Sequence, residues 1–224
     1  MKGKHTNMKL EKMEDFFAAR LIGYDEHMKT EIEGAGEFYA YTASLLPGDA
    51  QARILDLGCG TGLELEAFFP LNPTARVTGI DLSRAMLNEL RRKLPKKDLT
   101  LIEASYFDVP FGTAVFDAAV SVESLHHFSA DRKAALYRKL RQALKKAGYF
   151  VLTDYFAESD EKEKEYFRVL QALKLEQGIE DNVICHYDTP LTVEHETETL
   201  RAAGFSEVKM MRRWENTCTL LAKV

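Results

Sequence analysis

The sequence has few of the features that mark several large classes of protein. It has only three cysteines in 224 residues, Cys59, Cys185 and Cys218, which are far apart and form no C-x-x-C pair. An odd, scattered set argues against a disulfide framework or a redox dithiol and indicates a reducing compartment. No apolar run approaches the roughly 18 residues of a membrane span, and the N-terminus lacks the apolar core of a signal peptide. We therefore expect a cytoplasmic protein with no membrane contact.

The chain also lacks a basic surface stripe. Its formal net charge is -5, and no Lys/Arg-rich segment is interleaved with aromatic residues, so nucleic acid is not an expected partner. With 46% hydrophobic residues, the chain is long enough to bury one well-formed core. We expect a small-molecule substrate, and the sequence leaves a monomer and a homodimer equally open.

One glycine-rich segment is the most informative part of the chain. Residues 54–62 read Ile-Leu-Asp-Leu-Gly-Cys-Gly-Thr-Gly, an apolar strand pattern followed by three glycines in five residues. Glycine lets the chain turn sharply, so that a ligand can lie against bare backbone. Asp81 ends the next apolar run, nineteen positions after the last glycine, where a carboxylate accepts hydrogen bonds from both hydroxyls of a ribose. The alternative is a glycine turn with a purely structural role, but that reading does not explain why an acidic residue, Asp81, stands at the end of the next strand.

The spacing of the glycines distinguishes between cofactors. A dinucleotide site has the pattern G-x-G-x-x-G, with a helix N-terminus facing a pyrophosphate, whereas this chain has G-x-G-x-G. The segment resembles the S-adenosylmethionine-binding loop of class I methyltransferases, whose cofactor has a ribose but no phosphate. The resemblance implies S-adenosylmethionine as the cofactor and S-adenosylhomocysteine as its product.

From about residue 53 onward, β-rich runs alternate with helical patterns, which is typical of a parallel sheet covered by helices on both faces. The runs that predict buried strands are 53–57, 76–80, 99–103, 116–122 and 149–155. The pattern over residues 129–147 predicts a helix, with Ser129 as its N-cap, Leu144 on its apolar stripe and Gly148 just past its end.

The C-terminal part completes the fold class. After a predicted helix at about 192–203, two β-rich runs at 208–213 and 217–224 are joined by a few residues and must be antiparallel. The sequence therefore predicts an α/β fold, a Rossmann-like three-layer sandwich with a mostly parallel seven-stranded sheet and one antiparallel strand. Class I methyltransferases have the same arrangement, so the resemblance spans a predicted domain of residues 51–224.

Two segments fall outside this core. Residues 1–50 are predicted to form an N-terminal helical cap of two helices, at about 10–21 and 38–46, separated by the polar segment 23–27. The second segment is an insertion at about 157–190. Both connect to the carboxyl ends of strands, where an open α/β sheet binds its ligands. We predict that they are the two halves of a substrate lid.

The resemblance assigns further residues to the cofactor. Asp56 stands where an acidic residue holds the ammonium of the methionine part, directly or through water. Leu82 and Met86 would line the adenine with an apolar surface. Many relatives have an aspartate where Ser105 stands, so either Ser105 or a backbone carbonyl must accept a hydrogen bond from the adenine amino group.

Aromatic rings near the sulfonium would help to hold its charge, and Tyr24 and Tyr106 are the candidates. Arg20 would pair with the cofactor carboxylate, or else it is an ordinary surface arginine. The complete set of predicted cofactor-binding residues is Tyr24, Asp56, Gly58, Cys59, Gly60, Asp81, Leu82, Met86, Ser105, Tyr106 and Ser121.

The segment 123–128, Glu-Ser-Leu-His-His-Phe, passes under the sulfonium by its position after the fourth strand. It contains no Asn/Asp-Pro-Pro-aromatic motif and no Pro-Cys pair, which argues against nucleobases as substrates. Either His126 or His127 would serve as a general base near neutral pH. Neighbours on a helix point about 100° apart, so only one of them faces the site. A hydrogen bond to a nearby loop is the alternative role for each.

These features predict an enzyme that transfers a methyl group to an O, N, S or C atom of a small molecule, mainly by proximity and desolvation. The histidine spacings match no metal-ligand pattern, so no metal site is predicted. Two other readings remain open. One is an NAD(P)-dependent oxidoreductase, although a Tyr-x-x-x-Lys pair is absent, and the other is a cofactor-binding regulator without turnover.

Overall fold

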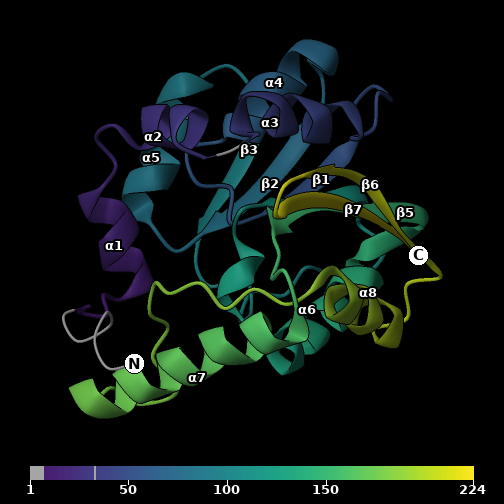
Figure 1. The fold of residues 1–224 in the computed structure, drawn as a ribbon. Helices are drawn as coiled ribbons and strands as arrows, with labels where there is room; N and C mark the ends of the chain where they lie inside the picture. The colour runs from purple at the N-terminus through teal and green to yellow at the C-terminus, as the bar shows by residue number, and fades with distance from the viewer. Residues whose placement is uncertain (1–7, 33) are drawn as a thin grey trace.

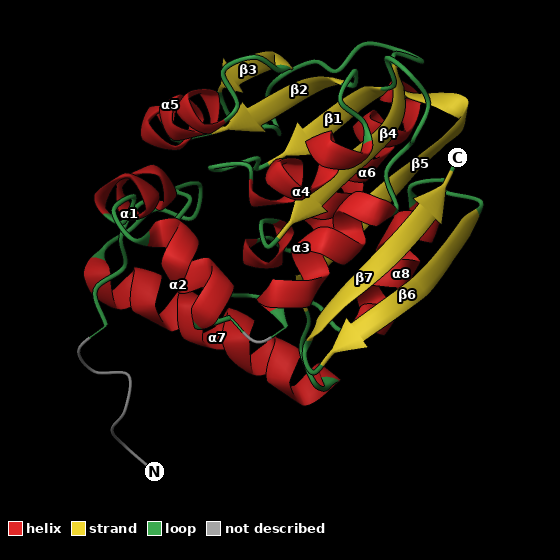
Figure 2. Cartoon of the chain, turned by 90° about the horizontal axis from the view of Figure 1, so that it is seen from above, coloured by secondary structure: helices red, strands yellow, loops and turns green. Residues whose placement is uncertain are grey.

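The computed structural model describes residues 8–32 and 34–224, so the first seven residues of the predicted cap lie outside the described part. Seven strands form one sheet in the order β3-β2-β1-β4-β5-β7-β6, which Figure 2 shows from above. The strands are β1 (Arg53–Leu57), β2 (Arg76–Asp81), β3 (Asp98–Glu103), β4 (Phe116–Val122), β5 (Leu144–Tyr155), β6 (Glu207–Trp214) and β7 (Thr217–Lys223). The strand β7 runs antiparallel to both of its neighbours, β5 and β6, and the other neighbouring strands of this sheet pair in parallel. The predicted fold class is confirmed.

Helices cover both faces of this sheet. They are α1 (Met13–Ala19), α2 (Tyr24–Thr30), α3 (Ala35–Ser44), α4 (Leu63–Leu71), α5 (Arg84–Lys93), the short η1 (Leu125–His127), α6 (Ala130–Ala143), α7 (Asp160–Gln177) and α8 (Val193–Ala202). In Figure 1, α3 and α4 lie above the sheet and α6 and α8 lie below it.

Alternation along the strands builds two separate cores. Ile54 and Leu55 are consecutive in β1, yet each is buried in a different hydrophobic cluster because strand side chains alternate between faces. Phe38 of α3 and Phe68 of α4 join the Ile54 cluster, and Leu136 of α6 joins the Leu55 cluster. Phe38 is fully buried, so α3 belongs to the core layer of the domain.

The described residues of the N-terminal segment form three helices where the sequence predicts two. Most of the polar segment 23–27, predicted as a connection, lies in α2, which begins after Gly23 in a left-handed conformation (φ +82°). Each of α1 and α2 has seven residues and a single buried one, Met13 and Met28 respectively. Helices this short depend on tertiary contacts rather than on apolar periodicity, which explains why α2 gave no signal.

The prediction of one helix over residues 129–147 is wrong at its C-terminal end. The helix α6 ends at Ala143, and Leu144 begins β5 by pairing with Phe116 of β4. The backbone N–H of Val115 also donates to the carbonyl of Ala143, at 2.7 Å. Leu144 is buried, as the apolar stripe of a helix would require. An inward-facing position in a strand buries a leucine equally well, and Leu144 adopts the strand conformation because it pairs with β4.

The insertion contains α7 and, after it, a return loop of residues 178–190, which contacts the N-terminal segment. Lys12 forms an antiparallel bridge with Cys185. The N–H of Met13 donates to Ile184 O at 3.1 Å, and the N–H of His186 donates to Glu11 O at 2.9 Å. The two predicted lid segments are therefore joined to each other through backbone hydrogen bonds. Within the described ranges, no helix combines the length and the apolar character that crossing a membrane requires.

Candidate active site

Two glycines of the loop are packed too tightly to carry a side chain. Gly58 has φ +75°, and a Cβ placed on it would collide with the side chain of Ser124. Gly62 also has φ +75°, and its Cβ would collide with Leu90 of α5. Both positions therefore need glycine for space as well as for backbone conformation.

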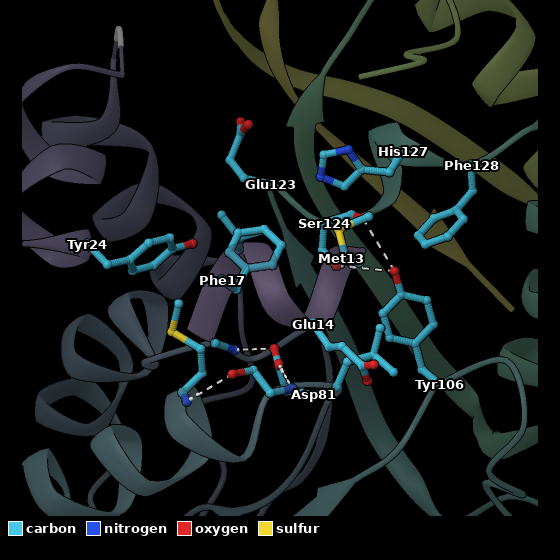
Figure 3. Close-up of a pocket in the computed structure, with 16 residues that line it drawn as sticks. Met13, Glu14, Phe17, Tyr24, Asp81, Tyr106, Glu123, Ser124, His127 and Phe128 are labelled. Carbon is cyan, nitrogen blue, oxygen red and sulfur yellow. Dashed lines mark hydrogen bonds between the residues drawn. The ribbon is translucent and has the colours of Figure 1, made fainter. Parts of the chain in front are cut away.

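Asp81 fastens this loop to the end of β2. Its Oδ2 accepts a hydrogen bond from the N–H of Gly60 at 2.9 Å, and its Oδ1 accepts one from the N–H of Ser83 at 2.8 Å, as the dashed lines in Figure 3 mark. Burial raises the pKa of Asp81 above its usual value, against the opposing effect of the two N–H donors. The carboxylate still has lone pairs available to the cavity beside it.

A first cavity lies over the loop and Asp81. Eight residues that the sequence predicts for the site line it, namely Tyr24, Gly58, Gly60, Asp81, Leu82, Met86, Tyr106 and His127. Its volume is only about 60 Å³, because Met13, Glu14 and Phe17 of α1 lie across it (Figure 3). Pockets that enclose a ligand of cofactor size are on the order of 300 Å³ or more.

Four predicted cofactor residues lie outside the lining of this cavity, and three of them, Cys59, Ser105 and Ser121, have structural partners instead. The thiol of Cys59 points to Gly79, where an added Cβ would lie 2.7 Å from it. Ser121 is fully buried and donates to Leu57 O at 2.9 Å, joining β4 to β1. Ser105 Oγ accepts the N–H of Phe107 at 3.2 Å. These side chains support the strand ends and turns around the cavity.

Asp56 also lies outside the lining, in a fully buried position close to Glu64 of α4. The two carboxyl groups contact each other, and apart from that contact neither oxygen of Asp56 nor Oε1 of Glu64 has a hydrogen-bond partner in the described part of the chain. Burial raises the pKa of both carboxyl groups, and the charge of Glu64 adds to the effect at Asp56. A pair of buried carboxyl groups without donors is unfavourable unless a proton or a cation satisfies it.

The two predicted tyrosines face the first cavity from opposite sides (Figure 3). The Tyr106 hydroxyl lies 3.2 Å from Ser124 Oγ, and Tyr24 enters from the start of α2. Arg20 instead pairs with Glu11, with 2.9 Å between Nη2 and Oε1, and lies over the ring of Phe16.

A second, larger cavity of about 810 Å³ adjoins the first. Four residues line both cavities and so form the wall between them: Phe17, Tyr24, Glu123 and His127. The larger cavity also has charged and aromatic groups from the return loop and the sheet end, among them Asp188, His186 and Trp214.

The structure distinguishes the two adjacent histidines. His126 lines only the larger of the two cavities, and its nitrogens face two carboxylates, Asp154 Oδ1 at 2.6 Å from Nδ1 and Asp188 Oδ1 at 3.5 Å from Nε2. Burial lowers the pKa of His126, but these carboxylates outweigh it and hold the pKa well above its usual value. Burial, with the charge of His126, lowers the pKa of His127.

Glu123 is a site residue that sequence reasoning missed. It follows β4 directly, has a left-handed backbone with φ +48°, and is the acceptor of a 3.2 Å hydrogen bond from Thr217 Oγ1. Burial raises its pKa to about 8. A non-glycine residue held in this conformation is uncommon and clusters at functional sites. Its position at a strand end was the one available signal.

Comparison with known proteins gives matches consistent with this geometry. Residues 54–148 match the family model described as "Methyltransferase domain". The malonyl-[acyl-carrier protein] O-methyltransferase of Legionella pneumophila is 33% identical over 105 residues, covering 46% of this chain and 36% of that protein. The carboxy-S-adenosyl-L-methionine synthase of Campylobacter curvus is 28% identical over 194 residues, covering 80% of each chain.

Solved structures agree on the fold. An S-adenosylmethionine-dependent methyltransferase from Mesorhizobium loti superposes with a TM-score of 0.58 at 23% identity, covering 82% of this chain and 96% of that one. By contrast, the chain spans little more than a third of the Legionella enzyme.

Proposed function

We propose that this chain, which carries a class I S-adenosylmethionine-dependent methyltransferase domain, transfers the cofactor's methyl group to a small molecule bound in the larger cavity. S-adenosylmethionine is the cofactor of the domain, as the glycine loop and Asp81 predict. The observation that carries the proposal is the wall shared by the two cavities, made of Phe17, Tyr24, Glu123 and His127. A sulfonium at that wall would present its methyl group to the second cavity.

The cofactor would use the residues around the first cavity. The ribose hydroxyls would donate to Asp81, and Leu82 and Met86 would lie against the adenine. The unsatisfied carboxyl oxygens of Asp56 and Glu64 support the prediction that the cofactor's ammonium is held near this pair, directly or through water. Tyr24 and Tyr106 would provide aromatic faces near the sulfonium.

Catalysis would depend mainly on position. The sulfonium is already an activated leaving group, and holding the acceptor, methyl carbon and sulfur in line and away from water contributes on the order of 7 to 11 kcal/mol. The catalytic role predicted for His126 and His127 stays a prediction. A neutral imidazole would help an acceptor in this cavity to lose its proton.

We restrict the proposed lid to α1, α2 and the insertion. Residues of α1 and α2 line the small first cavity and residues of the insertion line the larger one, whereas α3 is part of the core. Entry of the cofactor would require α1 to move, because Met13, Glu14 and Phe17 take up the space over Asp81. On this proposal the boundary predicted between a cap of residues 1–50 and a domain of residues 51–224 does not separate moving from fixed parts, because α3 belongs to the fixed core and the insertion to the lid.

A small-molecule acceptor and a cytoplasmic location are parts of the same proposal. The cavity of about 810 Å³ lies within the 300 to 1,000 Å³ range typical of small-ligand sites. All three cysteines are free and buried, which agrees with a reducing compartment.

The test is incubation with methyl-labelled S-adenosylmethionine and a metabolite extract, followed by mass spectrometry of labelled products. We expect one labelled small molecule, together with calorimetric binding of S-adenosylmethionine and S-adenosylhomocysteine in the micromolar range and no binding of NAD or NADP. Binding of NAD in preference would favour the oxidoreductase alternative. Cofactor binding with no labelled product from any extract would favour a regulator.

A further inference from the structure

The return loop brings an acidic side chain to the histidine pair. His126 and His127 form the end of η1, and Asp188 approaches them from the loop that follows α7. One donor atom from each of the three side chains lies within 4.8 Å of the other two. The backbone fixes this meeting, because the N–H of Thr189 donates to the carbonyl of His126 at 2.8 Å.

We propose that His126, His127 and Asp188 bind a divalent transition metal ion in the larger cavity, with Zn²⁺ as the best match to the donor set. Two imidazoles and one carboxylate form a common protein ligand set for such ions, and catalytic zinc sites leave a fourth position open. The sequence predicted no metal site, because Asp188 is 61 residues beyond His127 and no local spacing reveals the set.

The distances fit shared ligation better than direct hydrogen bonding. His126 Nε2 lies 3.5 Å and His127 Nδ1 lies 3.3 Å from the same oxygen, Oδ1 of Asp188. Charged N–H···O bonds are about 2.7 to 2.9 Å. Two ligands on a tetrahedral ion with bonds of about 2.0 to 2.1 Å are separated by about 3.3 to 3.5 Å. The Asp188 contacts therefore have the length of the edges of a coordination tetrahedron.

A buried carboxylate orients the first imidazole. Asp154 Oδ1 lies 2.6 Å from His126 Nδ1, and Asp154 Oδ2 accepts the N–H of Leu125 at 3.0 Å. Asp154 is only 1% exposed. Metal-binding histidines usually donate their second ring N–H to such a partner, which fixes the tautomer and leaves the other nitrogen free to ligate. Here that other nitrogen is Nε2, on the side of Asp188.

The second imidazole has a choice of tautomer. His127 Nδ1 also lies 3.2 Å from the carbonyl oxygen of Tyr187. Coordination through Nδ1 requires the ring proton to be on Nε2. A ligated His127 therefore has no free lone pair, so metal binding and a general-base role for this residue exclude each other.

The open side of the cluster faces the place assigned to the acceptor. All three ligands line the larger cavity, and the His186 ring lies 5.1 Å from that of His127. Space remains for a water molecule or an acceptor oxygen as a further ligand. In this part alone the inference rests on the proposed function: a metal-bound hydroxyl would lose its proton more readily and become the methyl acceptor.

The test measures metal binding without cofactor or acceptor, so its outcome is independent of methyl transfer. The full chain, without a polyhistidine tag and stripped with a chelator, is titrated with Zn²⁺ by calorimetry and with Co²⁺ by visible absorption. We expect one ion per chain and the strong absorption of tetrahedral Co²⁺. Asp188→Asn should weaken Zn²⁺ binding at least tenfold, since loss of even an outer-shell partner costs 10-fold to 100-fold.

His27→Gln is the matched control, because His27 lines the same cavity away from the cluster, and it should bind Zn²⁺ as the wild type does. Thermal melting checks that each variant is folded. Should Asp188→Asn fail to fold, His127→Gln takes its place with the same expected loss. The proposal is overturned if the wild type binds no ion, if the folded cluster variant binds as tightly as the wild type, or if His27→Gln loses as much affinity.

Discussion

Asp81 Oδ2 accepts the backbone N–H of Gly60 at 2.9 Å, so the proposed ribose anchor and the glycine loop are one hydrogen-bonded unit. The two were predicted separately, from a strand end and from a glycine spacing. Their contact means that a change at Asp81 acts on the cofactor directly and also through the shape of the loop.

We predict that Asp81→Ala weakens S-adenosylhomocysteine binding by about 1.5 to 3 kcal/mol, the scale of hydrogen bonds to a charged group. Calorimetry measures the loss, and thermal melting checks the fold. Asp98→Ala, at the exposed start of β3, is the control and should bind normally. Unchanged affinity in Asp81→Ala would remove the ribose assignment.

The raised pKa of Asp81 predicts opposite effects of pH on binding and on stability. Ribose hydroxyls donate to the ionised carboxylate, so cofactor affinity should be full above this pKa and fall as the pH drops through it. Because burial raises the pKa, the decline should begin at a higher pH than for an ordinary aspartate. The folded state favours the protonated form, so the contribution of Asp81 to stability is present at low pH and lost as the pH rises. Cofactor affinity and the free energy of unfolding are measured against pH for the wild type and for Asp81→Asn, and the difference between the two proteins isolates the contribution of Asp81. Curves that run parallel for the two proteins would contradict both predicted effects.

We predict that Asp56→Asn makes the cofactor-free protein more stable and at the same time weakens cofactor binding. Its buried carboxyl oxygens lack donors, so Asp56→Asn should remove an unfavourable group and raise the melting temperature of the cofactor-free protein. Each kcal/mol gained corresponds to about 2 to 4 °C for a chain of this size. If the pair with Glu64 holds the cofactor's ammonium, the same change should weaken S-adenosylmethionine binding by at least tenfold. A variant that is more stable and binds normally would assign Asp56 no part in the cofactor site.

The lid prediction now separates two parts of the N-terminal segment. The helices α1 and α2 each have a single buried residue, whereas α3 has five, including Phe38 and Tyr39. Hydrogen exchange should therefore be fast in α1 and α2 without ligand and slower with S-adenosylhomocysteine, because weakly packed elements open first. The α3 amides should be protected in both states. Equal protection of all three helices without ligand would show that they form one fixed layer.

Features of the fold and site that depend on local sequence patterns could be predicted from the sequence, and features that depend on tertiary contacts could not. Strand periodicity and the glycine spacing located the sheet and the loop, since both are local and Asp81 stands at a strand end where parallel strands converge on a ligand. Ser105 and Ser121 stand at similar positions but bond to Phe107 and Leu57, because the direction of a side chain at a strand end depends on its neighbours. Asp188 lies in the insertion that the sequence predicts as a lid segment, but only the tertiary path of the return loop shows that it meets the histidines.

Metal binding and a general-base role of the histidine pair predict opposite effects of a chelator on methyl transfer. If His126, His127 and Asp188 hold a metal ion, a chelator should abolish transfer to the acceptor that labelling identifies, and added Zn²⁺ should restore it. If His127 is instead a general base, transfer should survive the chelator and decline in acid, as the imidazole becomes protonated. His127→Gln lowers kcat by about 10² to 10⁴ on the base mechanism, so its activity alone does not separate the two. The chelator does, provided that calorimetry shows unchanged S-adenosylhomocysteine affinity after stripping, and we expect loss and metal-dependent recovery.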